Sequence, residues 1–220
     1  MKTFRALFND DMARAIVSGR KTVTRRPMAE QPKVWPSIGD GLWRGGRPFP
    51  HEGGPDPLAP CAPGDILIGR ECWQYAHPEY HSEDEGIRLG KPMDSDGRWC
   101  WYRADNDGME SGDHEDCRPR WRPSIHMPDW AARIRRRVVS VTVERVQDIT
   151  EEDAVREGFG TSEELEEHFR NCAPPGSRMA RPRDSFEAAW NSIYAAKGLA
   201  WDANPWVWRI EFASKNVPAA

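Results

Sequence analysis

The sequence lacks the paired cysteines from which disulfide-stapled domains and many zinc sites are built. Its five cysteines are an odd number, and none stands in a Cys-x-x-Cys pair. Reduced thiols of this kind are typical of cytosolic proteins. One zinc alternative is offered by His114, Cys117 and His126, with help from His77 and His81. Because no second close pair completes a tetrahedral ligand set, we expect no metal and no other cofactor.

Long hydrophobic runs are also missing. No stretch approaches the roughly 18 apolar residues of a membrane-spanning helix, and residues 1–5 lack the apolar core of a signal peptide. We therefore expect a cytoplasmic protein that contacts no membrane. Excess positive charge is absent too: the formal net charge of −4 argues against a general nucleic-acid coat protein. One local basic patch is expected, formed by Arg133, Arg135, Arg136 and Arg137.

The order of expected elements indicates an α+β fold. No strand–helix–strand alternation recurs, which argues against a parallel doubly wound sheet. A mixed β-barrel with helices packed outside fits the order better. Strands are expected at residues 4–8, 66–68, 70–73, 99–103, 139–143 and 206–212. Helices are expected after caps at Asp10 or Asp11, at Thr150, at Thr161, and at Asp184 or Ser185, and Gly19 is well placed to end the first of them.

Three periodic stretches predict core residues. Val139, Val141 and Val143 alternate with polar residues, as in a half-buried strand. One face of the last strand carries Trp206, Trp208, Ile210 and Phe212, and one face of the last helix carries Phe186, Trp190, Ile193 and Tyr194. By contrast, residues 27–60 are rich in Pro and Gly without apolar periodicity. We expect them to contribute little to the core, and to form, with residues 74–130, two loop-rich insertions in a single domain spanning residues 1–220.

Lys21, three residues ahead of Thr24, is the strongest indication of a chemical activity in the chain. The neighbouring arginines disfavour the ammonium form of Lys21 and lower its pKa, and burial would lower the pKa further. A neutral lysine can take the proton of the Thr24 hydroxyl, which is a poor nucleophile until then. On a regular strand residues 21 and 24 point to opposite faces, so the two meet only if the backbone is irregular between them. The alternative is a helix end followed by a solvated basic strand.

The motif Gly19-x-Lys21-x-x-Thr24-x-Arg26 resembles the signature of the ASCH domain family, relatives of the PUA-like RNA-binding barrels. With threonine at position 24, the motif resembles that of the small bacterial N4-acetylcytidine amidohydrolases of this family. The stretch 149–157 resembles the short helix that supplies their catalytic carboxylate, which falls on Glu157. Three longer stretches, residues 99–105, 121–128 and 204–208, resemble larger ASCH-like proteins of phages and prophages.

This resemblance implies an amidohydrolase for an acylated pyrimidine nucleoside or base. Lys21 would act as base, Thr24 as nucleophile and Glu157 as proton donor. The expected substrate-binding residues are Gly19, Arg20, Arg25, Arg26 and Trp73. One of these arginines would stabilise the oxyanion or orient the base.

Two alternatives stay open. The first is a non-catalytic reader of RNA or a modified nucleic acid, in which loop tryptophans such as Trp43, Trp73 or Trp121 stack on bases. The second is a nuclease, although no carboxylate cluster has convincing spacing for a divalent ion. The expected partner is accordingly a modified nucleoside or RNA.

Overall fold

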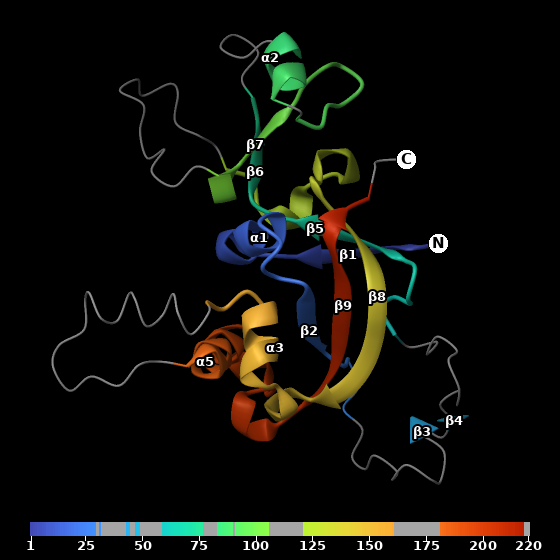
Figure 1. Cartoon of the computed structure of the whole chain (residues 1–220), viewed down its shortest axis with the longest axis vertical. Helices are drawn as coiled ribbons and strands as arrows, with labels where there is room; N and C mark the ends of the chain where they lie inside the picture. The colour runs from blue at the N-terminus through green and yellow to red at the C-terminus, as the bar shows by residue number, and fades with distance from the viewer. Residues whose placement is uncertain are drawn as a thin grey trace, which may run out of the picture. The chain divides into compact units, whose positions relative to one another are not determined.

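The computed structural model describes residues 1–29, 31, 43–44, 47–48, 59–76, 83–89, 91–105, 121–160 and 181–217. It has the mixture of helices and strands expected for an α+β fold. The chain forms two compact units, each assembled from separate stretches (Figure 1). Unit 1 comprises Met1–Gly19, Ile66–Arg137 and Ser214–Ala220, and unit 2 comprises Arg20–Asp65 and Val138–Ala213.

Nine strands and four helices are described, in addition to short 3-10 turns. The strands are β1 (Thr3–Leu7), β2 (Val23–Pro27), β3 (Trp43–Arg44), β4 (Arg47–Pro48), β5 (Ile66–Arg70), β6 (Trp73–Tyr75), β7 (Cys100–Tyr102), β8 (Ile134–Arg145) and β9 (Trp206–Asn216). The helices are α1 (Asp10–Val17), α2 (Glu83–Arg88), α3 (Glu151–Arg156) and α5 (Pro182–Tyr194).

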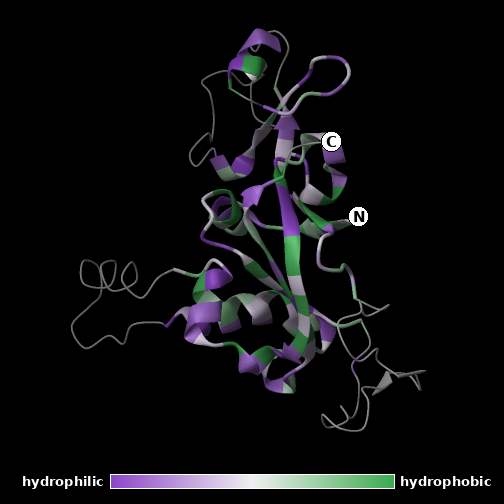
Figure 2. Cartoon of the chain, turned by 45° about the vertical axis from the view of Figure 1, so that its right-hand side comes forward, coloured by the Kyte–Doolittle hydropathy of each residue, from purple (hydrophilic) through white to green (hydrophobic). Residues whose placement is uncertain are grey.

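The main sheet has the hydrogen-bonded order β1-β5-β8-β9-β2. Among the strands that the structure describes, none closes the sheet by pairing β1 with β2, so the sheet is open. Its long strands carry both hydrophobic and hydrophilic residues along their length (Figure 2), because each face of a strand meets different surroundings.

In unit 1, β5 pairs in parallel with β1 and antiparallel with the first residues of β8. α1 begins one residue earlier than a cap at Asp10 would place it, because the Asn9 side chain accepts a hydrogen bond from the Met12 amide at 2.9 Å. The core of this unit includes Ile66, Ile68, Trp73, Cys100, Tyr102, Met127, Ala131 and Ala132. The 74–130 stretch is therefore more than loop: it contributes α2, the β6–β7 pair and buried side chains.

The basic stretch at the start of β8 does not form one patch. Its side chains alternate between the two faces of the strand. Arg136 is buried and donates a hydrogen bond to the carbonyl of Ile16 at 2.7 Å. Arg133 makes a bidentate pair with the fully buried carboxylate of Glu71, both bonds being 2.9 Å. The predicted patch is therefore wrong, since half of it holds the fold together.

In unit 2, β2 runs antiparallel to β9, with Thr24 opposite Ile210 and Arg25 opposite Arg209. The helices α3 and α5 lie side by side (Figure 1). They share a core formed by Val146, Ile149, Ala154, Phe186, Trp190, Tyr194, Trp201 and Val207. The Trp190 indole nitrogen is satisfied by the carbonyl of Leu199 at 2.8 Å.

Several core and boundary predictions need correction. α5 begins at Pro182, after Arg181, rather than after Asp184. Ile193 is 53% exposed although its helical spacing placed it with the core. Val139 is equally exposed. The neighbouring Val138 is the buried residue, so the alternation is offset by one position there.

Predictions on residues 27–60 are tested only at a few positions. Met28 is almost completely buried, so this residue of the stretch does contribute to the core. Gln31 ties the same segment to β9, since its amide donates to the Trp206 carbonyl at 3.0 Å. Most of residues 32–58 and the helix expected after Thr161 lie outside the described residues.

Candidate active site in unit 2

Lys21 lies in the short segment between the end of α1 and the start of β2. Gly19 adopts a φ of 82° directly after the C-cap residue Ser18, as predicted for a helix end. Lys21 therefore precedes the regular strand, and the alternation of strand side chains does not constrain it. The next residue, Thr22, donates its amide to the carbonyl of Arg156 at 2.9 Å, which anchors this segment to α3.

Glu157 is the C-cap residue of α3, and local sequence puts it there. The Thr150 side chain caps the first turn by accepting from the Asp153 amide at 3.1 Å, as predicted. The Glu157 amide closes the last turn on the Asp153 carbonyl at 2.8 Å. Gly158 then takes a φ of 99°, a conformation that suits glycine. A helix of fixed length thus delivers the carboxylate of Glu157 at its end.

The structure brings Lys21 and Glu157 together across 136 residues of sequence. The ammonium Nζ of Lys21 lies 2.5 Å from Oε2 of Glu157 and 2.6 Å from the Glu157 backbone carbonyl oxygen. The two side chains are 2% and 4% exposed. Burial is the largest influence on Lys21 and lowers its pKa, with Arg26 and Arg25 adding to the effect, while Glu157 opposes it.

Arg25 is held by three carboxylates and has no exposed side-chain surface. Its Nε lies 2.6 Å from Glu144, Nη2 lies 2.5 Å from Asp153, and Nη1 lies 3.3 Å from Oε1 of Glu157. Three of the five N–H donors of this fully buried guanidinium are thus taken up by carboxylates of the protein. The expected substrate-binding role of Arg25 therefore does not fit the structure.

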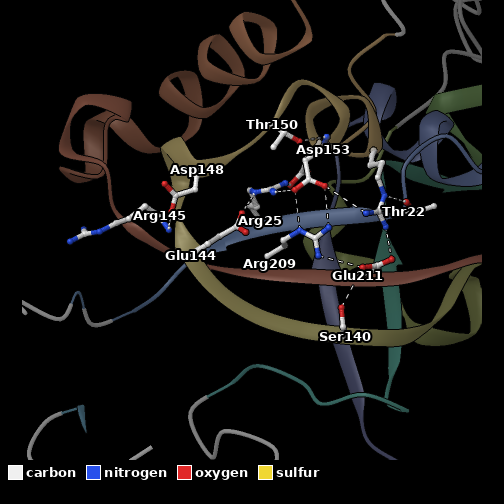
Figure 3. Close-up of polar contacts among 12 residues, drawn as sticks. Thr22, Arg25, Ser140, Glu144, Arg145, Asp148, Thr150, Asp153, Arg209 and Glu211 are labelled. Carbon is white, nitrogen blue, oxygen red and sulfur yellow. Dashed lines mark hydrogen bonds and ion pairs between the residues drawn. The ribbon is translucent and has the colours of Figure 1, made fainter. Parts of the chain in front are cut away.

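Arg25 also belongs to a wider ion network that includes Glu144, Asp153, Arg209 and Glu211 (Figure 3). Asp153 accepts hydrogen bonds from both Arg25 and Arg209, and although burial opposes them, these bonds hold its pKa below the ordinary value. Arg156 and Arg209 both bind Glu211, which also receives a hydrogen bond from Ser140. The network balances four cations, Lys21, Arg25, Arg156 and Arg209, against four carboxylates, Glu144, Asp153, Glu157 and Glu211.

Sequence reasoning missed most of this network. A usable signal was present in β9, where Arg209 and Glu211 alternate with the apolar face. Two charged residues on one face of a half-buried strand predict partners on the element that covers that face. The partner was not deducible, because it lies on α3, more than fifty residues away in sequence.

Thr24 lies inside β2 and is 3% exposed. On this strand its side chain leaves the opposite face from that of Arg25. Within the described part of the chain, the Thr24 side chain makes no hydrogen bond, so none joins it to Lys21 or Glu157. The structure thus pairs two of the three predicted catalytic residues, and the third lies on β2 without a hydrogen bond to either of them.

The other predicted site residues fall into two groups. Arg20 is exposed and Arg26 is half-buried, and Arg26 shares a strand face with Thr24. Trp73 lies in unit 1, is 1% exposed and makes an edge-on contact with Tyr75 at 5.1 Å between ring centroids. A ring buried in a core has no free face for a base, so the base-stacking role does not fit Trp73.

No group of histidine, cysteine or carboxylate side chains suited to a metal ion occurs among the described residues. His126 is described, whereas His114 and Cys117 of the zinc alternative lie outside the described residues. Across the same described residues, no helix is both long and apolar enough to cross a membrane.

Comparisons of the chain with protein-family models, with curated proteins and with solved structures find no match.

Proposed function

We propose that this protein is an amidohydrolase with a PUA-like, ASCH-type fold that removes an acyl group from the exocyclic amine of a modified pyrimidine nucleoside or base. The observation that carries the proposal is the buried Lys21–Glu157 pair. Lys21 directly precedes β2, the strand that bears Thr24. The resemblance of the Lys21, Thr24 and Glu157 motifs to N4-acetylcytidine amidohydrolases supplies the substrate class.

The first step needs a base. Because burial lowers the pKa of Lys21, a larger fraction of this lysine is neutral at a given pH than for a solvated lysine. Neutral Lys21 takes the proton of the Thr24 hydroxyl while the oxygen attacks the acyl carbon. Turnover should therefore rise with pH as Lys21 loses its proton.

The second step releases the amine. The tetrahedral intermediate collapses, the carbon–nitrogen bond breaks, and the departing nitrogen takes a proton from the Lys21–Glu157 pair, with Glu157 as the donor. Water then hydrolyses the acyl–threonine ester, which releases the carboxylic acid and restores the hydroxyl. Arg26 is better placed than Arg25 to meet the developing oxyanion, because it shares a strand face with Thr24, whereas Arg25 lies on the opposite face.

A second candidate is a non-catalytic module that binds RNA or a modified nucleic acid. It is favoured by the nearly complete burial of Lys21, Thr24 and Glu157. A substrate reaches such residues only if the surrounding groups move. If they do not, the ion pair holds β2 against α3 and the nucleotide binds elsewhere on the chain.

The test is an assay of the purified chain with N4-acetylcytidine, and with a short RNA that contains this base, in the presence of a chelator. We expect equal amounts of acetate and deacetylated product, and no loss of rate on chelation. Binding of either probe without product would overturn the proposal in favour of the binding module. Loss of turnover on chelation alone would instead indicate a metal-dependent hydrolase.

A further inference from the structure

We propose that Arg25 is a positioning residue that holds the carboxylate of Glu157 in place against the ammonium of Lys21. The inference concerns the arrangement of the ion pair, and its catalytic consequence rests on the proposed function. The motif resemblance assigned Arg25 to the substrate, whereas the contacts in unit 2 assign it to the protein.

The two oxygens of Glu157 are divided between two cations. Oε2 faces Lys21 at 2.5 Å and Oε1 faces Nη1 of Arg25 at 3.3 Å. A carboxylate held at only one oxygen rotates about its last side-chain bond, whereas one held at both oxygens has a defined plane. Arg25 therefore fixes the plane in which Glu157 presents an oxygen to Lys21.

Arg25 is itself fixed by contacts that do not involve Glu157. Its Nε binds Glu144 at the end of β8, and Nη2 binds Asp153 within α3, at 2.6 and 2.5 Å. Three contacts on a planar guanidinium leave it no rotational freedom. The guanidinium is thus fixed by β2, β8 and α3, and it in turn positions the carboxylate of Glu157.

Arg25 also acts on Lys21 through charge. The charged groups that influence Lys21 are Glu157 at the end of α3 and Arg25 and Arg26 on β2. Removing Arg25 removes a positive neighbour and, among the described residues, leaves Glu157 paired with Lys21 alone. Loss of the positive charge favours the ammonium form, so Lys21 should lose its proton at a higher pH, whereas loss of the hold on Glu157 loosens the ion pair and acts in the opposite direction.

The experiment follows Lys21 directly by its side-chain NMR titration in ¹³C- and ¹⁵N-lysine-labelled protein. The chain has few lysines, and Lys21→Arg identifies the resonance. We expect Arg25→Gln to move the Lys21 titration to higher pH by about one pH unit. Arg25→Lys, which keeps the charge but loses the fork, should instead move it to lower pH, because the ion pair is loosened while the positive neighbour remains.

Two further variants separate positioning from a merely structural role. Arg209→Gln is the matched control, because Arg209 binds Asp153 and Glu211 but does not contact Glu157. It should leave the Lys21 titration unchanged. If Arg25→Gln fails to fold, Arg25→Gln combined with Glu144→Gln removes one of the stranded carboxylates, and the same shift is expected. The positioning role is overturned if Lys21 titrates at the same pH in wild type and in the folded Arg25 variant.

The titration does not require turnover, so the two proposals fail separately. A shift in Arg25→Gln together with an inactive wild type would retain the positioning role and reject the hydrolase. If the wild type is active but its Lys21 titration is unchanged by substitution of Arg25, the hydrolase proposal is retained and the positioning role is rejected. When both hold, the low-pH limb of the rate profile should move with the titration.

Discussion

Thr24→Val should reduce release of acetate from N4-acetylcytidine by at least about a thousandfold. Valine keeps the shape of threonine and removes the oxygen that forms the acyl intermediate. In this structure the Thr24 side chain makes no hydrogen bond with any described residue, so the substitution breaks no existing contact. The variant should therefore still fold, which a thermal unfolding curve checks. Its activity is measured as the initial rate at saturating substrate.

Thr22→Val is the matched control for this prediction. Thr22 is the neighbouring hydroxyl, and it accepts a hydrogen bond from Arg156 at 3.4 Å (Figure 3). We expect its removal to change the rate by less than about tenfold. The reverse pattern, with Thr22→Val inactive and Thr24→Val active, would transfer the nucleophile to position 22.

Glu157→Leu should destabilise the protein by about 3–5 kcal/mol, because it strands the buried ammonium of Lys21 without a counter-charge. Lys21→Met should be costly for the same reason, since it leaves Glu157 with only the longer contact to Arg25. The double variant Lys21→Met with Glu157→Leu should recover much of the loss, because it buries neither charge. Denaturant unfolding of the four proteins measures this cycle.

A less buried pair in the same network gives the scale for comparison. Arg156 and Glu211 are 30% and 29% exposed. We expect Glu211→Gln to cost no more than about 1 kcal/mol, because water screens the pair. If the Lys21 and Glu157 substitutions are additive instead of compensating, the two charges do not depend on each other in the folded state.

Local signals in the sequence predicted the elements that carry the site. Thr150 marks the start of α3 and Gly158 follows its end, as expected, because capping and positive-φ preferences depend on only a few neighbouring residues. The alternation of β9 was also informative, with Ile210 and Phe212 almost completely buried. These features depend on neighbours in sequence and therefore could be read without the fold.

Predictions that depended on distant partners fared worse. Trp73 is expected at the end of a strand over residues 70–73, with its ring available to a substrate, whereas the pairing of β6 and β7 buries that ring in unit 1. Ile193 has helical spacing with the core but faces outward, because α5 is covered on one side only. Arg25 was read as a substrate ligand because its three carboxylate partners lie more than a hundred residues away.

The proposed activation of Thr24 by the neutral amine of Lys21 is tested by the substitution Lys21→Arg. Arginine keeps the positive charge opposite Glu157, but a guanidinium with a pKa above about 12 cannot accept the threonine proton. The measurement is acetate release by Lys21→Arg and by wild type, with the same N4-acetylcytidine and with folding checked by circular dichroism. We expect a folded variant that still binds the nucleoside and releases no measurable acetate. A folded Lys21→Arg protein that hydrolyses the substrate at the wild-type rate would contradict it.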